Sequence, residues 1–107
     1  IVVHFHHLDS KHSIVWIRED FRINVEGAFN IIKKVLSNLK KDEGASVVFI
    51  SSVAAKSGMT FHSSIAASKA ALEGFARSLA SELAPRVAVS IIPTINFFIL
   101  IILDLII

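Results

Sequence analysis

The chain has 107 residues, which is enough for one domain and too few for two. Hydrophobic residues make up 53% of the sequence, and its 11 basic and 9 acidic residues are spread along the chain, so the composition excludes intrinsic disorder and argues against nucleic-acid binding. The absence of cysteine excludes disulfides, thiolate zinc ligands and a cysteine nucleophile, and it is compatible with the cytoplasmic location that we expect.

Residues 1–18 hold three of the five histidines but show no regular hydrophobic period, so we assign no element to them. His4, His6 and His7 form a short cluster that would suit a metal ion. No carboxylate lies at a suitable spacing from them, so we predict no metal site. The segment also lacks the basic and apolar regions of a signal peptide.

From residue 19 to residue 41, apolar side chains recur at intervals of three and four residues, which predicts an amphipathic helix with lysines near its C-terminal end. A polar break that ends at Gly44 follows. The next run, residues 46–50, is short, continuous and rich in β-branched side chains. It predicts a strand that is buried on both faces.

Residues 51–60 are small and polar and predict a loop, which a second helix over residues 63–84 follows until Pro85 limits it. Residues 87–92 predict another buried strand, ended by Pro93. This alternation indicates an α/β, three-layer fold with parallel strands and flanking helices. Because ligands bind at the carboxyl ends of parallel strands, the loop at 51–60 and the segment after Ile92 should share one functional edge.

The last residues, 95–107, are almost entirely apolar but are interrupted by Asn96 and Asp104. The segment is shorter than the roughly 20 residues that a membrane-spanning helix needs. We therefore expect a buried strand, or a tail that needs a partner, rather than a membrane anchor.

Three segments, INVEGAFN, SVVFISSVAAKSGMTFHSSIAASKAALEGFARSLASELAPR and VAVSIIP, resemble the second half of the short-chain dehydrogenase/reductase family. The resemblance covers residues 20–93 and rests on the order and spacing of the motifs as a set. It implies a single, partial Rossmann-like domain over residues 1–107, with residues 1–18 and 94–107 atypical. It also implies an oxidoreductase that uses NAD or NADP on a small carbonyl or alcohol substrate.

Members of this family use an Asn, Ser, Tyr and Lys tetrad. The resemblance assigns Asn24, Ser52 and Lys69 to catalysis, and Lys69 and Pro93 to cofactor binding. The tyrosine should lie four residues before the lysine, one helical turn away, where an ammonium favours the phenolate; that residue is Ile65. Isoleucine has no proton to transfer, and general acid–base assistance is typically worth about a hundred- to ten-thousand-fold in rate.

Each of these residues also has a structural interpretation. Lys69 could be a solvated helix lysine, and Ser52 a strand-end hydroxyl that caps its own loop. Asn24 could be a helix N-cap or a side chain that bonds the helix backbone.

His62 is a tempting substitute acid, because it lies on nearly the same helix face as Lys69 and its unperturbed pKa suits proton transfer. We favour a surface or capping role for it, since nothing in the sequence orients its ring. Ser63, Ser64 and Ser68 are interpreted as helix-start and small packing residues.

None of the four glycines forms the glycine-rich turn that holds a cofactor pyrophosphate. We therefore expect a truncated reductase that is weakly active or inactive as this chain. The alternative is a non-catalytic interaction or oligomerisation module. In the family, the helices that correspond to residues 20–41 and 63–84 often form the subunit interface, so the resemblance implies a homo-oligomer.

Overall fold

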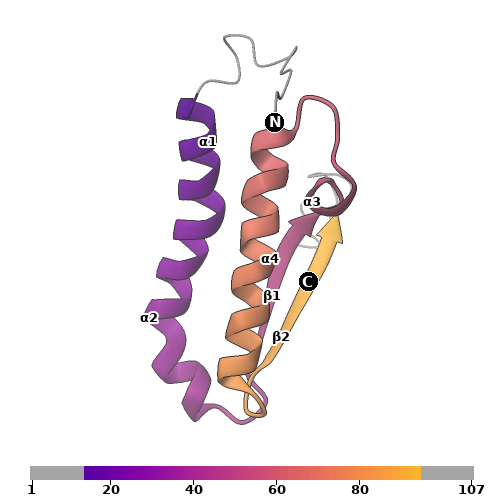
Figure 1. Ribbon diagram of the computed structural model, residues 1–107. Coiled ribbons are helices and arrows are strands. Elements are labelled where there is room, and N and C mark those ends of the chain that lie inside the picture. Colours follow the sequence, from indigo (N-terminus) through magenta and orange to yellow (C-terminus); the bar gives the residue numbers. More distant parts are fainter. Residues whose placement is uncertain (1–13, 95–107) are drawn as a thin grey trace, which may run out of the picture.

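The computed structural model describes residues 14–94, in which long helices cover one side of a small parallel sheet (Figure 1). His4, His6, His7 and the apolar tail at 95–107 lie outside the described residues.

The first helical segment runs from residue 14 to residue 41 without a break in the ribbon (Figure 1). It consists of helix α1 (Ile14–Phe21), a π-helical stretch η1 (Arg22–Glu26) and helix α2 (Gly27–Lys41). The predicted helix is confirmed, but it begins at Ile14 rather than at residue 19. Residues 14–17 are all apolar and all exposed, so this first turn has no apolar face that a periodic pattern would reveal.

The two predicted strands are confirmed as β1 (Ser46–Ser52) and β2 (Ala88–Thr94), which pair in parallel with Ser46 opposite Ala88. Strand β2 continues through Pro93, where we expected it to end. Within residues 14–94 its single neighbour is β1, so its other edge carries no strand. A proline on such an edge removes no hydrogen bond from the ladder.

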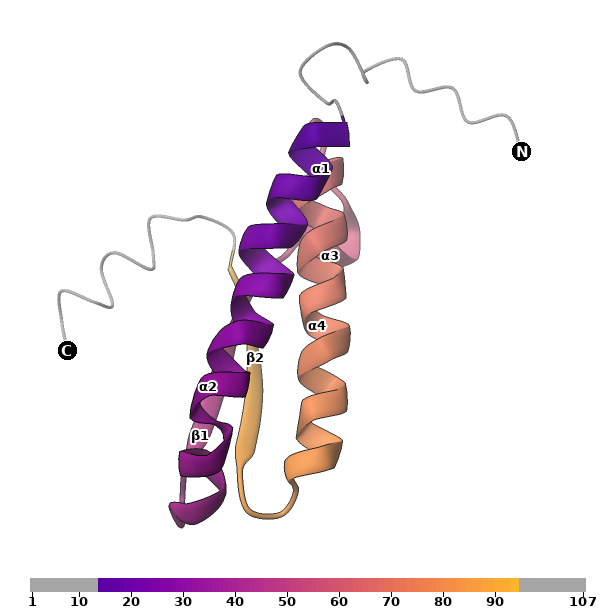
Figure 2. The ribbon, with the colours of Figure 1, turned by 90° about the vertical axis from the view of Figure 1, so that its left-hand side faces the viewer.

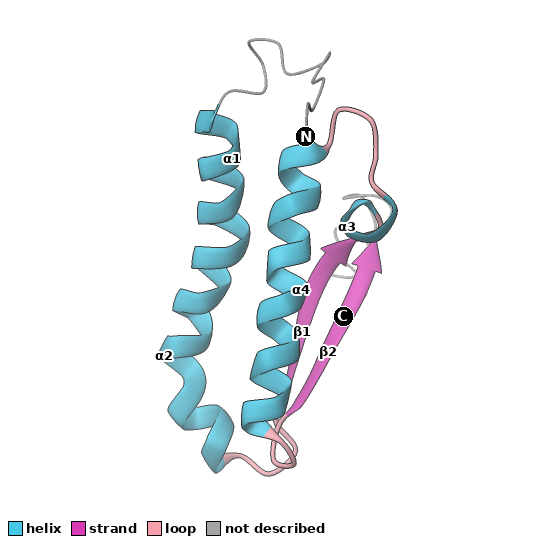
Figure 3. Cartoon of the chain, in the orientation of Figure 1, coloured by secondary structure: helices cyan, strands magenta, loops and turns pink. Residues whose placement is uncertain are grey.

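The connection between the strands contains helix α3 (Ala54–Ser57) and helix α4 (Ser63–Leu83) (Figure 3). The single turn of α3 lies inside the segment that we expected to be a loop. Helix α4 matches the predicted second helix and stops at Ala84, whose φ of −63° and ψ of 147° are extended. Pro85 imposes this conformation on the residue before it.

The core lies between the sheet and the two long helices α2 and α4, which stand side by side over it (Figure 2). Phe49 of β1 meets the ring of Phe75 of α4 edge to face, with 5.8 Å between the ring centroids. The buried residues of the core are Ile32, Phe49, Leu72, Ala76, Leu79, Leu83 and Val87.

The opposite face of the sheet is open in residues 14–94. Val48 and Ile92, which point away from the helices, are 51% and 47% exposed. Our prediction of a strand buried on both faces is therefore wrong for this part of the chain, because the helices described here lie on one side only. The α/β class, with parallel strands and flanking helices, is confirmed. Among the described helices, none is long and apolar enough to cross a membrane.

Candidate functional site

The carboxyl ends of β1 and β2 meet at one edge of the sheet, as predicted. The amide of Val53 donates to the carbonyl of Thr94 over 3.2 Å, and the Thr94 hydroxyl donates to the carbonyl of Ser51 over 3.1 Å. These two contacts join the loop after β1 to the end of β2. Parallel α/β folds bind their ligands at such an edge.

Lys69 reaches this edge from helix α4. Its Nζ donates to the carbonyl of Ile50 over 2.9 Å, so the side chain crosses from the helix to the strand instead of extending into solvent. Burial lowers the pKa of the Lys69 ammonium. An ammonium has three donors, so two remain for another partner. The solvated-lysine interpretation does not describe this residue.

Ser52 is the last residue of β1. Its Oγ accepts a hydrogen bond from the amide of Ala54 over 3.2 Å, at the start of α3. This is the capping contact that the structural interpretation of Ser52 predicts. The hydroxyl proton is not used by that bond and can still be donated.

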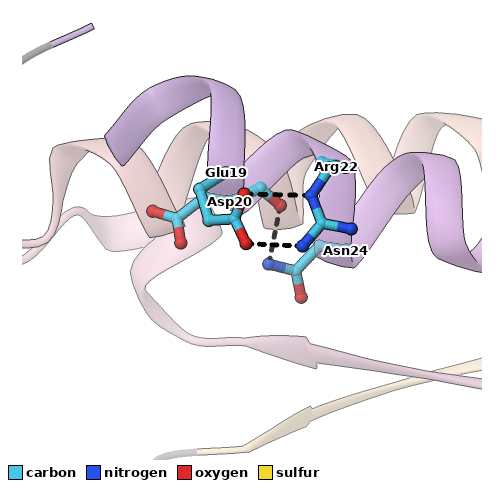
Figure 4. Close-up of polar contacts among 4 residues, drawn as sticks. All are labelled: Glu19, Asp20, Arg22 and Asn24. Carbon is cyan, nitrogen blue, oxygen red and sulfur yellow. Dashed lines mark hydrogen bonds and ion pairs between the residues drawn. The ribbon is translucent and has the colours of Figure 1, made fainter. Parts of the chain in front are cut away.

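Asn24 lies in the middle of the π-helical stretch, a feature that is frequent at functional sites. Its side-chain amide donates to the carbonyl of Asp20 over 3.0 Å (Figure 4) and to the hydroxyl of Ser68 over 3.4 Å. Asn24 is therefore a mid-helix side chain that bonds the backbone, and not an N-cap. Within residues 14–94 no hydrogen bond joins Asn24, Ser52 and Lys69 to one another.

Ile65 lies on α4 one turn before Lys69 and is partly buried. No proton donor occupies the position that a tyrosine would hold. His62 lies just before α4, is exposed, and has its ring Nδ1 2.7 Å from the carbonyl of Thr60. His62 occupies the N-cap position of α4, but its side chain makes no capping hydrogen bond, so its exposure agrees with the surface role and not with the capping role that we also considered.

Sequence reasoning missed a buried pair beside the site. Ser51 donates to a carboxylate oxygen of Glu73 over 2.6 Å, and both side chains are buried. A signal was present, because Glu73 falls on the apolar stripe of α4 between Leu72 and Ala76. An acid on a buried helix face needs a polar partner, although the sequence does not say which one.

A second polar contact ties the two helical segments together. Ser64 at the start of α4 donates to the carboxylate of Asp20 over 2.5 Å. On the outer side of the same turn, Arg22 forms an exposed ion pair with Glu19 (Figure 4). Among the residues described, no group of three or more histidine, cysteine or acidic side chains is placed to hold a metal ion.

An open groove of about 630 Å³ lies between the first helical segment and α4. Phe29 and Phe75 approach each other there, with 6.1 Å between their ring centroids. Phe29 remains 51% exposed, so the groove is apolar and accessible. The lining residues are Arg18, Phe21, Arg22, Val25, Glu26, Phe29 and Phe75.

Residues 3–96 match the protein family that is described as "short chain dehydrogenase". The uncharacterized oxidoreductase YusZ of Bacillus subtilis is 40% identical over 68 residues, which are 64% of this chain and 24% of that protein. Human retinol dehydrogenase 8 is 41% identical over 71 residues, 66% of this chain and 23% of that protein. The 2,3-dihydro-2,3-dihydroxybenzoate dehydrogenase of Escherichia coli is 36% identical over 67 residues, 63% of this chain and 27% of that protein.

The chain thus spans about a quarter of the length of these relatives. No solved structure matches it.

Proposed function

The chain belongs to the short chain dehydrogenase family, and on this premise we propose that it supplies the substrate side and the nicotinamide side of an NAD(P)-dependent oxidoreductase. The substrate would be a small carbonyl compound or alcohol. The observation that carries the proposal is the position of the Lys69 side chain, which reaches from α4 to the carbonyl of Ile50, two residues before Ser52. The match of the family over most of the chain supports it.

The described residues fit one end of the cofactor. Lys69 has two unused ammonium donors, which suit ribose hydroxyls, and Pro93 lies exposed at the end of β2. The pyrophosphate end has no counterpart, because the sequence contains no glycine-rich turn. Lys69 and Pro93 would therefore hold the nicotinamide ribose, and a bound cofactor would supply the hydride.

The chain's own residues can bind and orient a substrate but are poor at moving its proton. Ser52 can donate its hydroxyl proton in a hydrogen bond to a substrate oxygen. Ile65 cannot protonate that oxygen. We therefore propose that carbonyl reduction by the chain as it stands is weak or absent, since the general-acid contribution is missing.

A titration with cofactor fragments tests this proposal. Reduced nicotinamide mononucleotide is added to the isotope-labelled chain, and amide chemical shifts are followed by NMR. We expect changes at Ser52, Val53 and Thr94 with a dissociation constant in the millimolar range, and NADH should bind no tighter. ADP, which lacks the nicotinamide, should leave these amides unmoved.

The Lys69→Ala variant is the matched control, and it should lose the response to the mononucleotide. Shifts elsewhere in the chain, or an equal response to ADP, would argue against the cofactor role of this edge. Micromolar binding of NADH would show that the pyrophosphate is held after all.

The groove supports a second candidate, a module that associates with a second copy of this chain. Along its rim, Arg18, Arg22 and Glu26 follow one another at helical spacing. An antiparallel copy, related by a two-fold axis at Arg22, would bring Arg18 of each chain toward Glu26 of the other and would cover both Phe29 rings. The two Arg22 side chains would meet at the axis, each with its charge offset by Glu19 of its own chain. This charge order favours a second copy over an unrelated apolar partner.

Sedimentation of two variants tests this dimer. Phe29→Asp places a charge in the groove and should shift the chain to monomer by roughly tenfold or more in dissociation constant, since burying an unpaired charge is costly. Ile31→Asp changes an exposed apolar residue of the same helix outside the groove, and it should leave association unchanged. Equal effects of the two variants would contradict the groove as the interface.

A further inference from the structure

Two polar side chains of α4 hold the end of β1. Glu73 accepts a hydrogen bond from the Ser51 hydroxyl over 2.6 Å, and Lys69 donates to the Ile50 carbonyl over 2.9 Å. Lys69 and Glu73 are separated by four positions, so they lie one turn apart on the same face of the helix. Two successive turns of α4 thus bind two successive residues of β1, one through a donor and one through an acceptor.

The contact between Ser51 and Glu73 lies in the interior. Ser51 is 1% exposed and Glu73 is 5% exposed. The other partner of the carboxylate is Arg77, whose Nη1 is 3.5 Å away and whose side chain is largely exposed. Because that ion pair is long and solvated, the Ser51 hydroxyl is the close, buried partner that the carboxylate depends on.

Ser51 passes this constraint on to the functional edge. Its carbonyl accepts from the Thr94 hydroxyl over 3.1 Å, and the Thr94 carbonyl accepts from the Val53 amide over 3.2 Å. Ser52 lies between Ser51 and Val53, so both of its chain neighbours are held. A shift of Ser51 would therefore move Ser52 relative to Lys69.

We infer that Glu73 is a positioning residue, which fixes the carboxyl end of β1, and with it Ser52, against helix α4 next to Lys69. The roles of Ser52 and Lys69 rest on the proposed function, but the contacts themselves do not. A buried carboxylate at this place has a local effect that an apolar side chain of similar size would lack: it sets the register between the helix and the strand end.

Amide hydrogen exchange of the full 107-residue chain tests the inference. Glu73→Met and Ser51→Ala should each raise exchange at Val53 and Ala54 by roughly tenfold or more, as expected for losing a hydrogen bond to a charged group. Exchange at Ala76 and Leu79, inside α4, should change far less. Glu73→Gln, whose amide oxygen can still accept from Ser51, should restore protection, and Arg77→Met should have no effect.

A second readout is the titration of the Lys69 ammonium, followed by NMR of labelled lysine. In Ser51→Ala, which leaves the Glu73 side chain in place, the pKa of Lys69 should move up toward its ordinary value, because the strand end no longer holds the ammonium in a buried place. In the exchange measurement, combining Glu73→Met with Ser51→Ala should add little to either substitution alone, since both remove the same contact.

Two outcomes would overturn the inference. The first is a uniform rise in exchange across β1 and α4, which would mean that Glu73 stabilises the whole fold and not this edge. The second is an unchanged Lys69 titration in Ser51→Ala, a variant that leaves the helix intact. If Glu73→Met does not fold, Ser51→Ala and Glu73→Gln still test whether Glu73 positions the end of β1. If Ser51→Ala does not fold either, the contact stabilises the whole fold, which would contradict a local role. Loss of cofactor binding with these contacts intact would instead refute the proposed function.

Discussion

At position 65 the chain has an isoleucine where the resemblance to the family places a tyrosine. Ile65 lies one helical turn before Lys69, and the ammonium of Lys69 is already at the end of β1. A phenol placed there would lie near a cation that favours its ionised form. The Lys69 ammonium would therefore suit a proton-transfer group at position 65, which the sequence does not supply.

We predict that Ile65→Tyr raises carbonyl reduction by roughly a hundredfold or more when a glycine-rich, cofactor-binding half is supplied, which is the size of a general-acid contribution. The measurement is NADH or NADPH oxidation at saturating cofactor over one panel of carbonyl substrates. Adding Lys69→Ala should cancel most of the gain. If Ile65→Tyr binds cofactor normally and gains nothing on any substrate, then Asn24, Ser52 and Lys69 do not form a reaction site.

The lowered pKa of Lys69 also predicts a dependence of stability on pH. Burial lowers the pKa in the folded chain, so between that value and the ordinary lysine value the unfolded chain binds more protons. Stability from this group is therefore present above the ordinary lysine pKa, and it is lost as the pH falls through the folded pKa. In urea unfolding, the unfolding free energy of the unmodified chain should rise across this alkaline window relative to that of Lys69→Met. If the difference in unfolding free energy between the two proteins stays constant or falls as the pH rises, the prediction is contradicted.

At the level of elements, the sequence predicts what depends on periodicity and turn chemistry. The helix at 63–84, the two strands and the stop before Pro85 follow from spacing of apolar residues and from the constraint that proline places on its neighbour. The π-helical stretch around Asn24 does not follow, because an inserted wider turn leaves no mark in a pattern of apolar residues. The exposure of Val48 could not be predicted either, since it depends on which layers accompany the strand.

The site shows the same division. Chain order at the sheet edge placed Ser52 and the segment after Ile92 together, as the contact of Val53 with Thr94 confirms. Which polar side chains pair with one another could not be predicted from the sequence. Glu73 could be identified as an acid on an apolar face, but its pairing with Ser51 depends on how α4 crosses the strand. Side chains far apart in the sequence acquire partners only when the helix and the strand pack.

The contact between α1 and α4 gives a prediction at this scale. Ser64 donates to the Asp20 carboxylate over 2.5 Å and is itself buried, and the start of α4 is a favourable place for a negative charge. We predict that Ser64→Ala lowers the free energy of unfolding by about 1–2 kcal/mol, because the partly buried carboxylate loses a donor. Urea unfolding measures this, with Ser63→Ala, an exposed neighbour on the same helix turn, as the control. Equal midpoints for the two variants would show that the contact contributes nothing.

On the scale of the whole molecule, residues 14–94 bury one face of a parallel sheet and leave the other face and both outer edges without a neighbour. Parallel sheets are normally covered on both faces, since the crossover helices lie on both sides. The open edges present unpaired amides and carbonyls beside exposed apolar side chains, and such edges pair with other chains. The described part of the chain therefore has two surfaces suited to association, the helical groove and the open side of the sheet.

These two surfaces should associate differently, and this gives the last prediction. Contacts through the groove, related by a two-fold axis, close at a dimer, whereas sheet edges can add further chains without limit. Val48→Lys and Ile92→Lys place charges on the open face of β1 and β2, which should suppress species larger than a dimer, since charged side chains block edge pairing. Light scattering over a concentration series measures this, with Ser81→Lys, at an exposed polar position of α4, as the control for added charge alone. Large species that persist in the Val48 and Ile92 variants, or that vanish equally in the Ser81 variant, would contradict the sheet as the site of growth.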